Sequence, residues 1–265
     1  VIPGRVKGKE AIVYTHTCHP SLANDNLTGI AVAVVLARAL LDVHPRLTWR
    51  FVFGPGTIGS LTWLSRNEHL LQNVCAGFTI GLLGDSGSLT YKRSRRGACI
   101  TDRVAEYVLG RWPSPANIVD FEPYGYDERQ FCSPGFDLPI GRLTRSSNGQ
   151  YREYHTSADD LNFVQPVCLA ESIRVFARMI EILDTNRCLL NLSPKGEPRL
   201  GRRGLYGNTG GTAPSEIEHA MLWVLNQSDG KHDLLSIAER SGLEFELLDN
   251  AASALESAGL AEILL

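Results

Sequence analysis

The stretch AIVYTHTCHPSLANDNLTG, residues 11–29, holds residues whose types and spacing fit metal chemistry. An apolar, strand-like run ends at His16 and His19, and a short loop then supplies Asp25 between two asparagines. An unbroken helical run follows. Imidazole and carboxylate are ligands that zinc prefers, so a strand end followed by a helix entrance can bring them together as a metal site. The stretch therefore predicts one part of such a site.

Two later segments supply further candidate ligands at loop positions. Asp85 follows the apolar run AGFTIGLLG, and His155 lies in YHTSADDL, before a long helical run. Either residue alone would more often be a turn, cap or structural residue. In an open α/β sheet, however, ligands collect at the carboxyl ends of strands, where His16, His19 and Asp85 all fall.

The elements that must position these residues alternate along the first two-thirds of the chain. The predicted strands are mostly apolar, as in a sheet covered on both faces. They are Ala11–His16, Leu47–Phe53, Gly77–Leu83, Leu89–Lys92 and Leu138–Leu143. The predicted helices are Leu27–Leu41, Ile58–Asn67, Thr101–Leu109 and Leu161 to about Leu183. This alternation predicts a three-layer α/β/α domain, residues 1–190, with a mixed, largely parallel sheet.

A smaller domain is expected after a linker. Residues 191–213 are rich in glycine, proline and basic residues and show no periodicity, as in a linker. Residues 214–265 predict a small winged-helix-like domain with a final edge strand in AGLAEILL. Its predicted helices are Ser215–Asn226, Leu234–Ser241 and Phe245–Ser257.

The charge of this last segment argues against DNA as its partner. Residues 214–265 contain ten acidic and two basic residues. Duplex DNA is held mainly through Lys and Arg contacts to phosphates. We therefore expect no nucleic-acid partner, and instead contact with a protein or with a second copy of the chain.

Composition sets the broad class of the chain. Six scattered cysteines without a CxxC pair are typical of reduced thiols, so we expect a cytoplasmic protein. No apolar run in the sequence approaches the roughly 20 residues that cross a bilayer, so we expect no membrane partner. The chain begins at Val1 rather than methionine and enters a strand almost at once, which favours a sequence that is incomplete at its N-terminus.

The order of the motifs resembles that of the zinc-dependent aminopeptidases whose α/β domain binds two co-catalytic metal ions. The resemblance covers about residues 10–185 and is greatest with a branch often found beside polysaccharide or natural-product biosynthesis genes. Members of that branch are longer at the N-terminus and carry a winged-helix-like tail. The motifs that carry the resemblance are ANDNLTG at 23–29, FVFGPGTIGS at 51–60, LLGD at 82–85, GYDERQF at 125–131 and EYHTSADD at 153–160.

The resemblance implies two zinc ions and a role for each candidate ligand. Asp25 would bridge the two ions. His19 and Asp85 would complete the site of one ion, and His155 would bind the other. His16 competes with His19 for its role: it lies nearer the strand end, whereas the HPS context of His19 matches the branch better.

The chain departs from the family pattern in the segment 54–57, which reads GPGT. Typical members place a glutamate base and a second glutamate ligand there, and the closer branch usually keeps one, in PETIGS. Glycine cannot take a proton, so general-base catalysis from Gly56 is lost. Asp127 and Glu128 are the predicted replacements, because the GYDERQF loop faces the metals in the family. The alternative is that both are surface charges.

Two arginines are candidates for binding a substrate anion: Arg129, in the same loop, and Arg145, shortly before YHTS. The leading hypothesis is a zinc-dependent aminopeptidase-like hydrolase that acts on a peptide or a small amide. The alternative is a degenerate peptidase fold that serves as a binding or scaffold protein. The missing glutamate favours the alternative, and the four retained ligands favour the enzyme.

Overall fold

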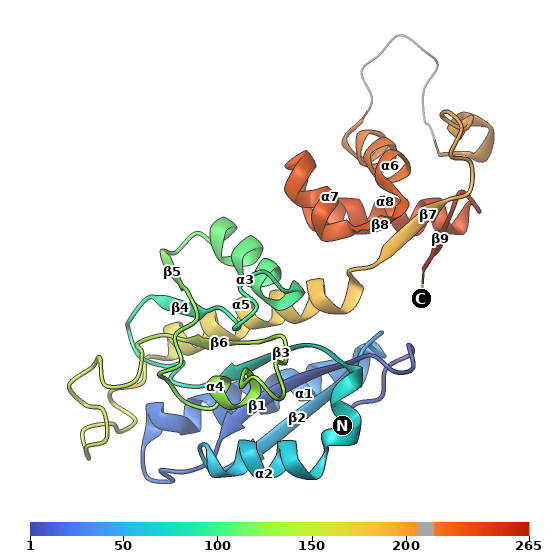
Figure 1. Ribbon diagram of the computed structural model, residues 1–265. Helices are drawn as coiled ribbons and strands as arrows, with labels where there is room; N and C mark the ends of the chain where they lie inside the picture. Colours follow the sequence, from blue (N-terminus) through green and yellow to red (C-terminus); the bar gives the residue numbers. More distant parts are fainter. Residues whose placement is uncertain (206–214, 265) are drawn as a thin grey trace. The chain divides into compact units, whose positions relative to one another are not determined.

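The computed structural model describes residues 1–205 and 215–264, which divide into two compact units, 1–184 and 185–265 (Figure 1). Residues 206–213 of the predicted linker lie outside the described residues. Before it, the chain forms the strand β7 (Cys188–Asn191) and a 3₁₀ helix, Leu200–Arg203. The strand β7 belongs to the second unit.

A six-stranded mixed sheet, in the order β2-β1-β3-β6-β4-β5, forms the centre of the first unit. Its neighbouring strands are parallel except for β4 and β6, which are antiparallel. The strands are β1 (Glu10–His16), β2 (Thr48–Gly54), β3 (Val74–Ile80), β4 (Leu89–Lys92), β5 (Ala116–Val119) and β6 (Ile140–Thr144). The prediction of a mixed, largely parallel sheet is confirmed. The strand β5 was not predicted from the sequence, because Asn117 interrupts its short apolar run.

Helices cover both faces of this sheet. They are α1 (Gly29–Val43), α2 (Ile58–Arg66), α3 (Ile100–Arg111), α4 (Glu128–Phe131) and α5 (Pro166–Thr185), with a 3₁₀ helix at Glu68–Asn73. Alternate residues of a strand point to opposite faces. Tyr14 of β1 packs with Leu64 of α2 and Phe131 of α4. Phe78 of β3 faces the other way and meets Phe176 of α5, with ring centroids 5.0 Å apart. The predicted three layers are therefore present.

Two helices begin later than predicted, each for a local reason. Residues 23–28 form a separate, kinked helical turn, in which Asp25 and Asn26 have non-helical dihedral angles. The helix α1 therefore starts at Gly29. The helix α5 starts at Pro166, whose fixed φ and missing N–H suit the first turn of a helix.

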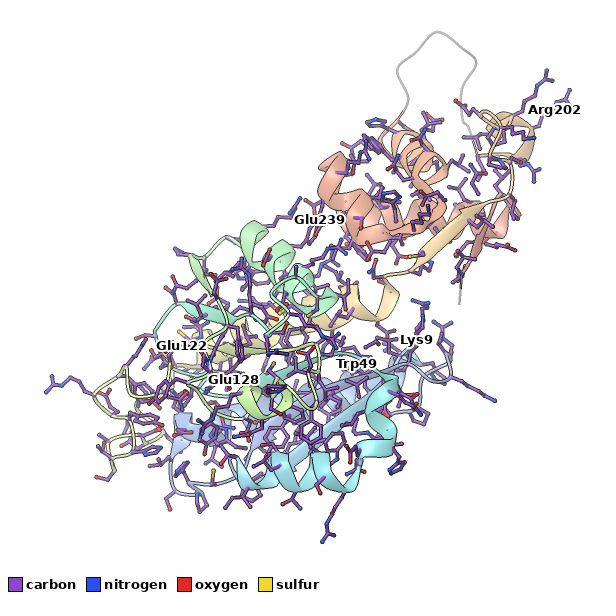
Figure 2. All side chains as sticks on the ribbon, viewed as in Figure 1. Lys9, Trp49, Glu122, Glu128, Arg202 and Glu239 are labelled. Carbon is purple, nitrogen blue, oxygen red and sulfur yellow. The ribbon has the colours of Figure 1, made fainter. Side chains whose placement is uncertain are left out.

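A buried carboxylate joins the end of α5 to the start of β2. Asp184 accepts hydrogen bonds from the backbone N–H groups of Arg46 (2.8 Å) and Leu47 (2.9 Å). It also accepts one from the indole N–H of Trp49 (3.0 Å). Trp49 is fully buried within the sheet unit (Figure 2). Because the Leu47 and Trp49 donors are buried and the Arg46 donor is partly buried, Asp184 is expected to stabilise this corner of the fold.

In its described residues, the second unit has three α-helices and a three-stranded antiparallel sheet in the order β8-β7-β9. Its further elements are α6 (Glu216–Gln227), β8 (Asp229–Asp233), α7 (Leu234–Ser241), α8 (Phe245–Ser257) and β9 (Ala261–Ile263). Phe245, Leu248 and Leu255 form one buried stripe along α8. The predicted winged-helix-like architecture is confirmed.

One segment, Ala23–Val43, is long and apolar enough to cross a membrane by length and composition alone, which the sequence analysis did not anticipate. The core helix of a soluble protein passes the same test. In this structure α1 packs against β1 and β2 and buries Val32, Ala33, Leu36 and Leu40.

Candidate metal centre

Asp25, 1% exposed, lies at the centre of the candidate site. One carboxylate oxygen, Oδ1, is 2.6 Å from Nε2 of His16, at the end of β1. The other, Oδ2, is 3.1 Å from Nε2 of His155 and 3.8 Å from Nδ1 of His19. The parallel strands β1 and β3 lie side by side, so segments that follow them meet at one edge of the sheet. The fold thus surrounds one carboxylate with three imidazoles.

The charge states of these groups suit metal binding. Burial lowers the pKa of the His16 imidazole, so the ring is neutral at neutral pH. Burial alone would raise the pKa of Asp25, but the hydrogen bond from His16 and the nearby His19 and His155 outweigh it and lower that pKa. Metal ligation requires a neutral imidazole and an ionised carboxylate. Both conditions are met at this site.

A second carboxylate holds the Asp25 loop in place. The Asp159 side chain accepts hydrogen bonds from the backbone N–H groups of Asn24 (2.6 Å) and Asp25 (3.0 Å). The side chain of Asn26 donates to the Thr15 hydroxyl and to the His16 carbonyl. Asp159 is fully buried and was not predicted as a site residue. Its position within YHTSADD, beside His155, was the available signal.

Backbone strain is concentrated around the site. His19 has φ 64° and His155 has φ 57°, in the left-handed region that non-glycine residues rarely adopt. Thr57, next to Gly56, has φ 49°. Such conformations cost on the order of 1–3 kcal/mol each and cluster where function requires them. Two of the three histidines are therefore held in unfavourable backbone conformations.

Asp85 lies beside this centre rather than within it. Its buried carboxylate accepts hydrogen bonds from the Asn24 side chain (3.0 Å), the Gly87 N–H (2.7 Å) and the Ser146 hydroxyl (2.6 Å). His19, Asp25 and His155 form a group of potential ligand atoms within 4.8 Å of one another, and Asp85 belongs to no such group among the described residues. The role of Asp85 as a ligand stays a prediction.

The residues present fit a metal ion. The Nδ1 atom of His19 is buried and has no hydrogen-bond partner among the described residues. An unpaired buried polar atom is costly unless a bound ion or water molecule satisfies it. Here that atom points to the same Asp25 oxygen that His155 contacts. A borderline-soft divalent cation such as zinc suits this set of imidazoles and carboxylate.

Tyr126 fills the space beside Gly56, where the resemblance implied a glutamate side chain. A Cβ atom built on Gly56 would lie 1.9 Å from the Tyr126 hydroxyl oxygen and 2.2 Å from its Cζ. The Tyr126 ring also packs against His16, with centroids 4.5 Å apart. The hydroxyl lies 3.0 Å from Cys18 Sγ. The missing glutamate therefore leaves no gap.

The two predicted replacement carboxylates differ in their surroundings. Asp127 accepts hydrogen bonds from the Ser60 hydroxyl (2.7 Å) and the Thr57 N–H (3.0 Å), and burial raises its pKa to about 6. Burial would also raise the pKa of Glu128, but Arg142 and Lys92 outweigh it and lower that pKa. The pKa of Asp127 therefore lies closer to neutral pH than usual, whereas Glu128 stays ionised at neutral pH.

The two predicted substrate-binding arginines also differ. Arg145 is buried and donates hydrogen bonds to Ser172, to the carbonyls of Gly87 and Cys168, and to Glu171. The Nε atom of Arg129 is buried without a hydrogen-bond partner among the described residues. All of these hydrogen bonds of Arg145 are made to groups of the protein itself. Contact of either arginine with a substrate stays a prediction.

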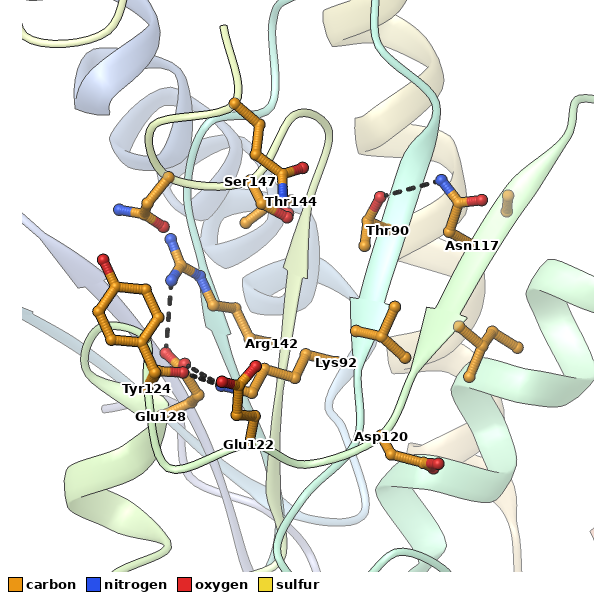
Figure 3. Close-up of a pocket in the computed structure, with 16 residues that line it drawn as sticks. Thr90, Lys92, Asn117, Asp120, Glu122, Tyr124, Glu128, Arg142, Thr144 and Ser147 are labelled. Atoms are coloured by element: carbon orange, nitrogen blue, oxygen red, sulfur yellow. Dashed lines mark hydrogen bonds and ion pairs between the residues drawn. The ribbon is translucent and has the colours of Figure 1, made fainter.

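A pocket of about 580 Å³ opens beside the centre, between β4, β5 and the loops around residues 120–128 and 144–150 (Figure 3). Glu128 lies at one side with Lys92 (3.0 Å) and Arg142 (3.5 Å). Asn148 of the pocket donates to the Tyr154 hydroxyl, and the Tyr154 ring stacks on His155 with centroids 4.0 Å apart. Asn148 and Tyr154 therefore link the pocket wall to His155.

Comparison with known proteins gives two family matches. A model described as a domain of unknown function (DUF4910) matches residues 1–186, and a winged helix-turn-helix model matches residues 187–263. A Clostridium acetobutylicum protein described as a polysaccharide biosynthesis protein with an aminopeptidase-like domain is 46% identical over 248 residues. These cover 93% of this chain but 57% of that protein, so the chain spans little more than half of the relative's length.

Solved structures show the same relationship. The crystal structure of a C. acetobutylicum protein described as a peptidase matches with a TM-score of 0.89 and 43% identity, over 99% of this chain and 59% of that one. The aminopeptidase of Aneurinibacillus sp. strain AM-1 has a TM-score of 0.59 at 18% identity, over 68% of this chain and 45% of that one. BSAP, a zinc aminopeptidase from Bacillus subtilis, also has a TM-score of 0.59, at 17% identity, over 68% and 48%. The predicted resemblance and fold are confirmed.

Proposed function

The chain belongs to the family of domains of unknown function DUF4910, whose model spans residues 1–186, and on this premise we propose that its α/β unit is a zinc-dependent, aminopeptidase-like hydrolase. The substrate would be a peptide or a small amide. The observation that carries the proposal is the convergence of His16, His19 and His155 on the buried carboxylate of Asp25, with one buried imidazole nitrogen unpaired.

Asp25 and its histidines would hold the metal, with Asp85 as a further ligand. When bound, zinc would polarise the substrate carbonyl and lower the pKa of water, which makes attack at neutral pH feasible. Asp159 fixes the backbone of the Asp25 loop. The low pKa of Asp25 and the neutral His16 ring mean that neither group has to change its charge state before metal binds.

Asp127 is the better candidate of the two for moving a proton. A general base works best when its pKa lies near the working pH, and burial brings that of Asp127 to about 6. Asp127, Tyr126 and His16 line the same small cavity of about 10 Å³, which is roughly room for one water molecule. Glu128, in contrast, is committed to Lys92 and Arg142.

The pocket shown in Figure 3 is proposed to receive the substrate. Its volume of about 580 Å³ lies within the usual range of roughly 300–1,000 Å³ for small-molecule sites. It is polar, with Thr90, Asn117 and Thr144 on its walls and both signs of charge present. Such a lining suits an amide or a short peptide better than an apolar ligand.

The test combines metal content with hydrolysis. Purified chain, dialysed against zinc, is expected to retain the metal and to cleave aminoacyl p-nitroanilides. His155→Ala should lower both metal content and rate, whereas His69→Ala, at an exposed histidine on a 3₁₀ helix, should change neither. Absence of bound metal in the wild-type chain would refute the proposal. Metal binding without hydrolysis of any aminoacyl or peptidyl amide would favour a binding protein instead.

A further inference from the structure

A second group of potential ligands lies next to Asp25, and it includes a thiol. Potential ligand atoms of His16, Cys18 and His19 lie within 4.8 Å of one another. All three come from the segment THTCH that leaves β1. His19 belongs to this group and also to the group with Asp25 and His155. The two groups are therefore adjacent and share an imidazole.

The Cys18 sulfur is held in a defined position by two neighbours. The backbone N–H of Gly56 donates a hydrogen bond to Sγ at 3.1 Å. The Tyr126 hydroxyl lies 3.0 Å from the same atom. Either of these two atoms can donate in the contact between the thiol and the hydroxyl. The two contacts together fix the position of Sγ.

These two neighbours occupy the place where the family pattern has glutamate. A side chain on Gly56 would overlap the Tyr126 ring, as its Cβ would lie 1.9 Å from the hydroxyl oxygen. The Gly56 N–H meets Cys18 instead. Where the family pattern has a carboxylate near the metals, this chain therefore has a sulfur positioned by a glycine and a tyrosine.

We infer that Cys18 is a metal ligand which, with His16 and His19, takes over the ligand role of the missing glutamate. Zinc binds cysteine and histidine together, and a thiolate suits a borderline-soft cation. Hydrogen bonds from Gly56 and Tyr126 would orient the sulfur, as groups around metal ligands commonly do. On binding, the thiol loses one proton to solvent as the sulfur–metal bond forms. This inference rests on the proposed metal centre.

The test replaces zinc with cobalt, because a thiolate bound to Co²⁺ produces a sulfur-to-metal charge-transfer absorption that imidazole and carboxylate ligands do not. The full-length wild-type chain loaded with Co²⁺ is expected to show this band. Cys18→Ser should abolish it, and Cys168→Ser, at a cysteine of α5, should leave it unchanged. Tyr126→Phe should keep the band and weaken Co²⁺ binding by roughly 10-fold, the lower end for losing such a supporting contact.

A measurement on the wild-type chain guards against a variant that does not fold. Alkylation with iodoacetamide, followed by peptide mass spectrometry, should modify Cys18 in the metal-free chain and spare it once Zn²⁺ is bound. Bound cobalt without the charge-transfer band, or a band that survives in a folded Cys18→Ser chain, would overturn the inference and leave the proposed metal centre intact. A chain that binds no metal would overturn both. A band without hydrolysis would support Cys18 as a ligand and count against the enzyme.

Discussion

Gly56→Glu, which restores the carboxylate of the related branch, is expected to destabilise the chain and not to activate it. The new Cβ would lie 1.9 Å from the Tyr126 hydroxyl oxygen and 2.2 Å from Cζ, whereas real Cβ atoms essentially never approach within 3.0 Å. The backbone is not the obstacle, because φ of Gly56 lies outside the left-handed region. The Tyr126 ring must therefore move.

The cost follows from the contacts that Tyr126 would lose. Overpacking in a well-filled site costs roughly 1–3 kcal/mol. The hydrogen bond to Cys18 contributes about 1 kcal/mol more, and the edge contact with His16 adds about 0.5 kcal/mol or more. We expect Gly56→Glu to lower the free energy of unfolding of the α/β unit by about 3 kcal/mol.

Two further variants at position 126 separate this clash from other effects. Tyr126→Phe removes the hydroxyl but leaves Cζ at 2.2 Å, so it should not relieve Gly56→Glu. Tyr126→Ala removes the ring, so the double variant should be more stable than the two single costs predict, by about 1 kcal/mol or more. We expect hydrolysis to rise only in that double variant, because only there can the glutamate enter the site.

The assay is urea unfolding of the metal-free chain, followed by tryptophan fluorescence. Three of the four tryptophans, Trp49, Trp63 and Trp112, lie in the α/β unit and report on it. With a slope of about 2–3 kcal/mol per molar, the expected loss moves the midpoint down by about 1 M. The reasoning fails if Gly56→Glu alone unfolds at the wild-type urea concentration, or if Tyr126→Phe rescues it as well as Tyr126→Ala.

Three other predictions concern buried carboxylates. The pKa of Asp127, about 6, lies above its unfolded value of about 3.9, so the stability it contributes is present at low pH and lost as pH rises through 6. Urea titrations between pH 4 and 7 should show a fall in the wild-type chain of up to about 3 kcal/mol that Asp127→Asn lacks; parallel curves would contradict this. Asp159→Ala should weaken zinc binding by roughly 10- to 100-fold in chelator competition, because the Asp25 loop loses two hydrogen bonds, whereas Asp160→Ala, at the exposed neighbour, should not. Asp184→Ala should cost about 3 kcal/mol in urea unfolding by leaving two buried N–H groups and one partly buried N–H group without an acceptor. The exposed Glu181→Ala should cost well under about 1 kcal/mol, and equal costs would refute the assignment.

The sequence predicted the fold where patterns were long and local. The sheet, most of its helices and the winged-helix-like unit followed from periodicity, and the motif order anticipated that Asp25 and His155 would meet. It could not decide between His16 and His19, because both side chains reach Asp25, from opposite carboxylate oxygens. The spacing of residues along one loop does not show which carboxylate oxygen of Asp25 each histidine ring faces.

What the sequence could not predict depends on contacts between distant segments. Tyr126 fills the space beside Gly56, although the two residues lie 70 positions apart in the sequence. A glycine in the sequence shows that a side chain is missing, but not which other residue takes its place. The Cys18 contact belongs to the same cluster. Asp159 lies 134 residues after Asp25 and supports it by accepting hydrogen bonds from backbone N–H groups. Every residue except proline has such a group, so the sequence does not mark this contact. Each of these needed the three-dimensional arrangement.

The Asp159 contact also sets the order in which the site can be built during synthesis. The Asp25 loop leaves the ribosome first, and His155 and Asp159, which complete its imidazole set and fix its backbone, are made 130 and 134 residues later. Chains are made from the N-terminus at about 5–20 residues per second, so the loop waits roughly 7–26 seconds for its partners. A nascent chain that ends before His155 holds Asp25 without its full set of imidazoles, so metal capture at this carboxylate comes after most of the α/β unit has been synthesised.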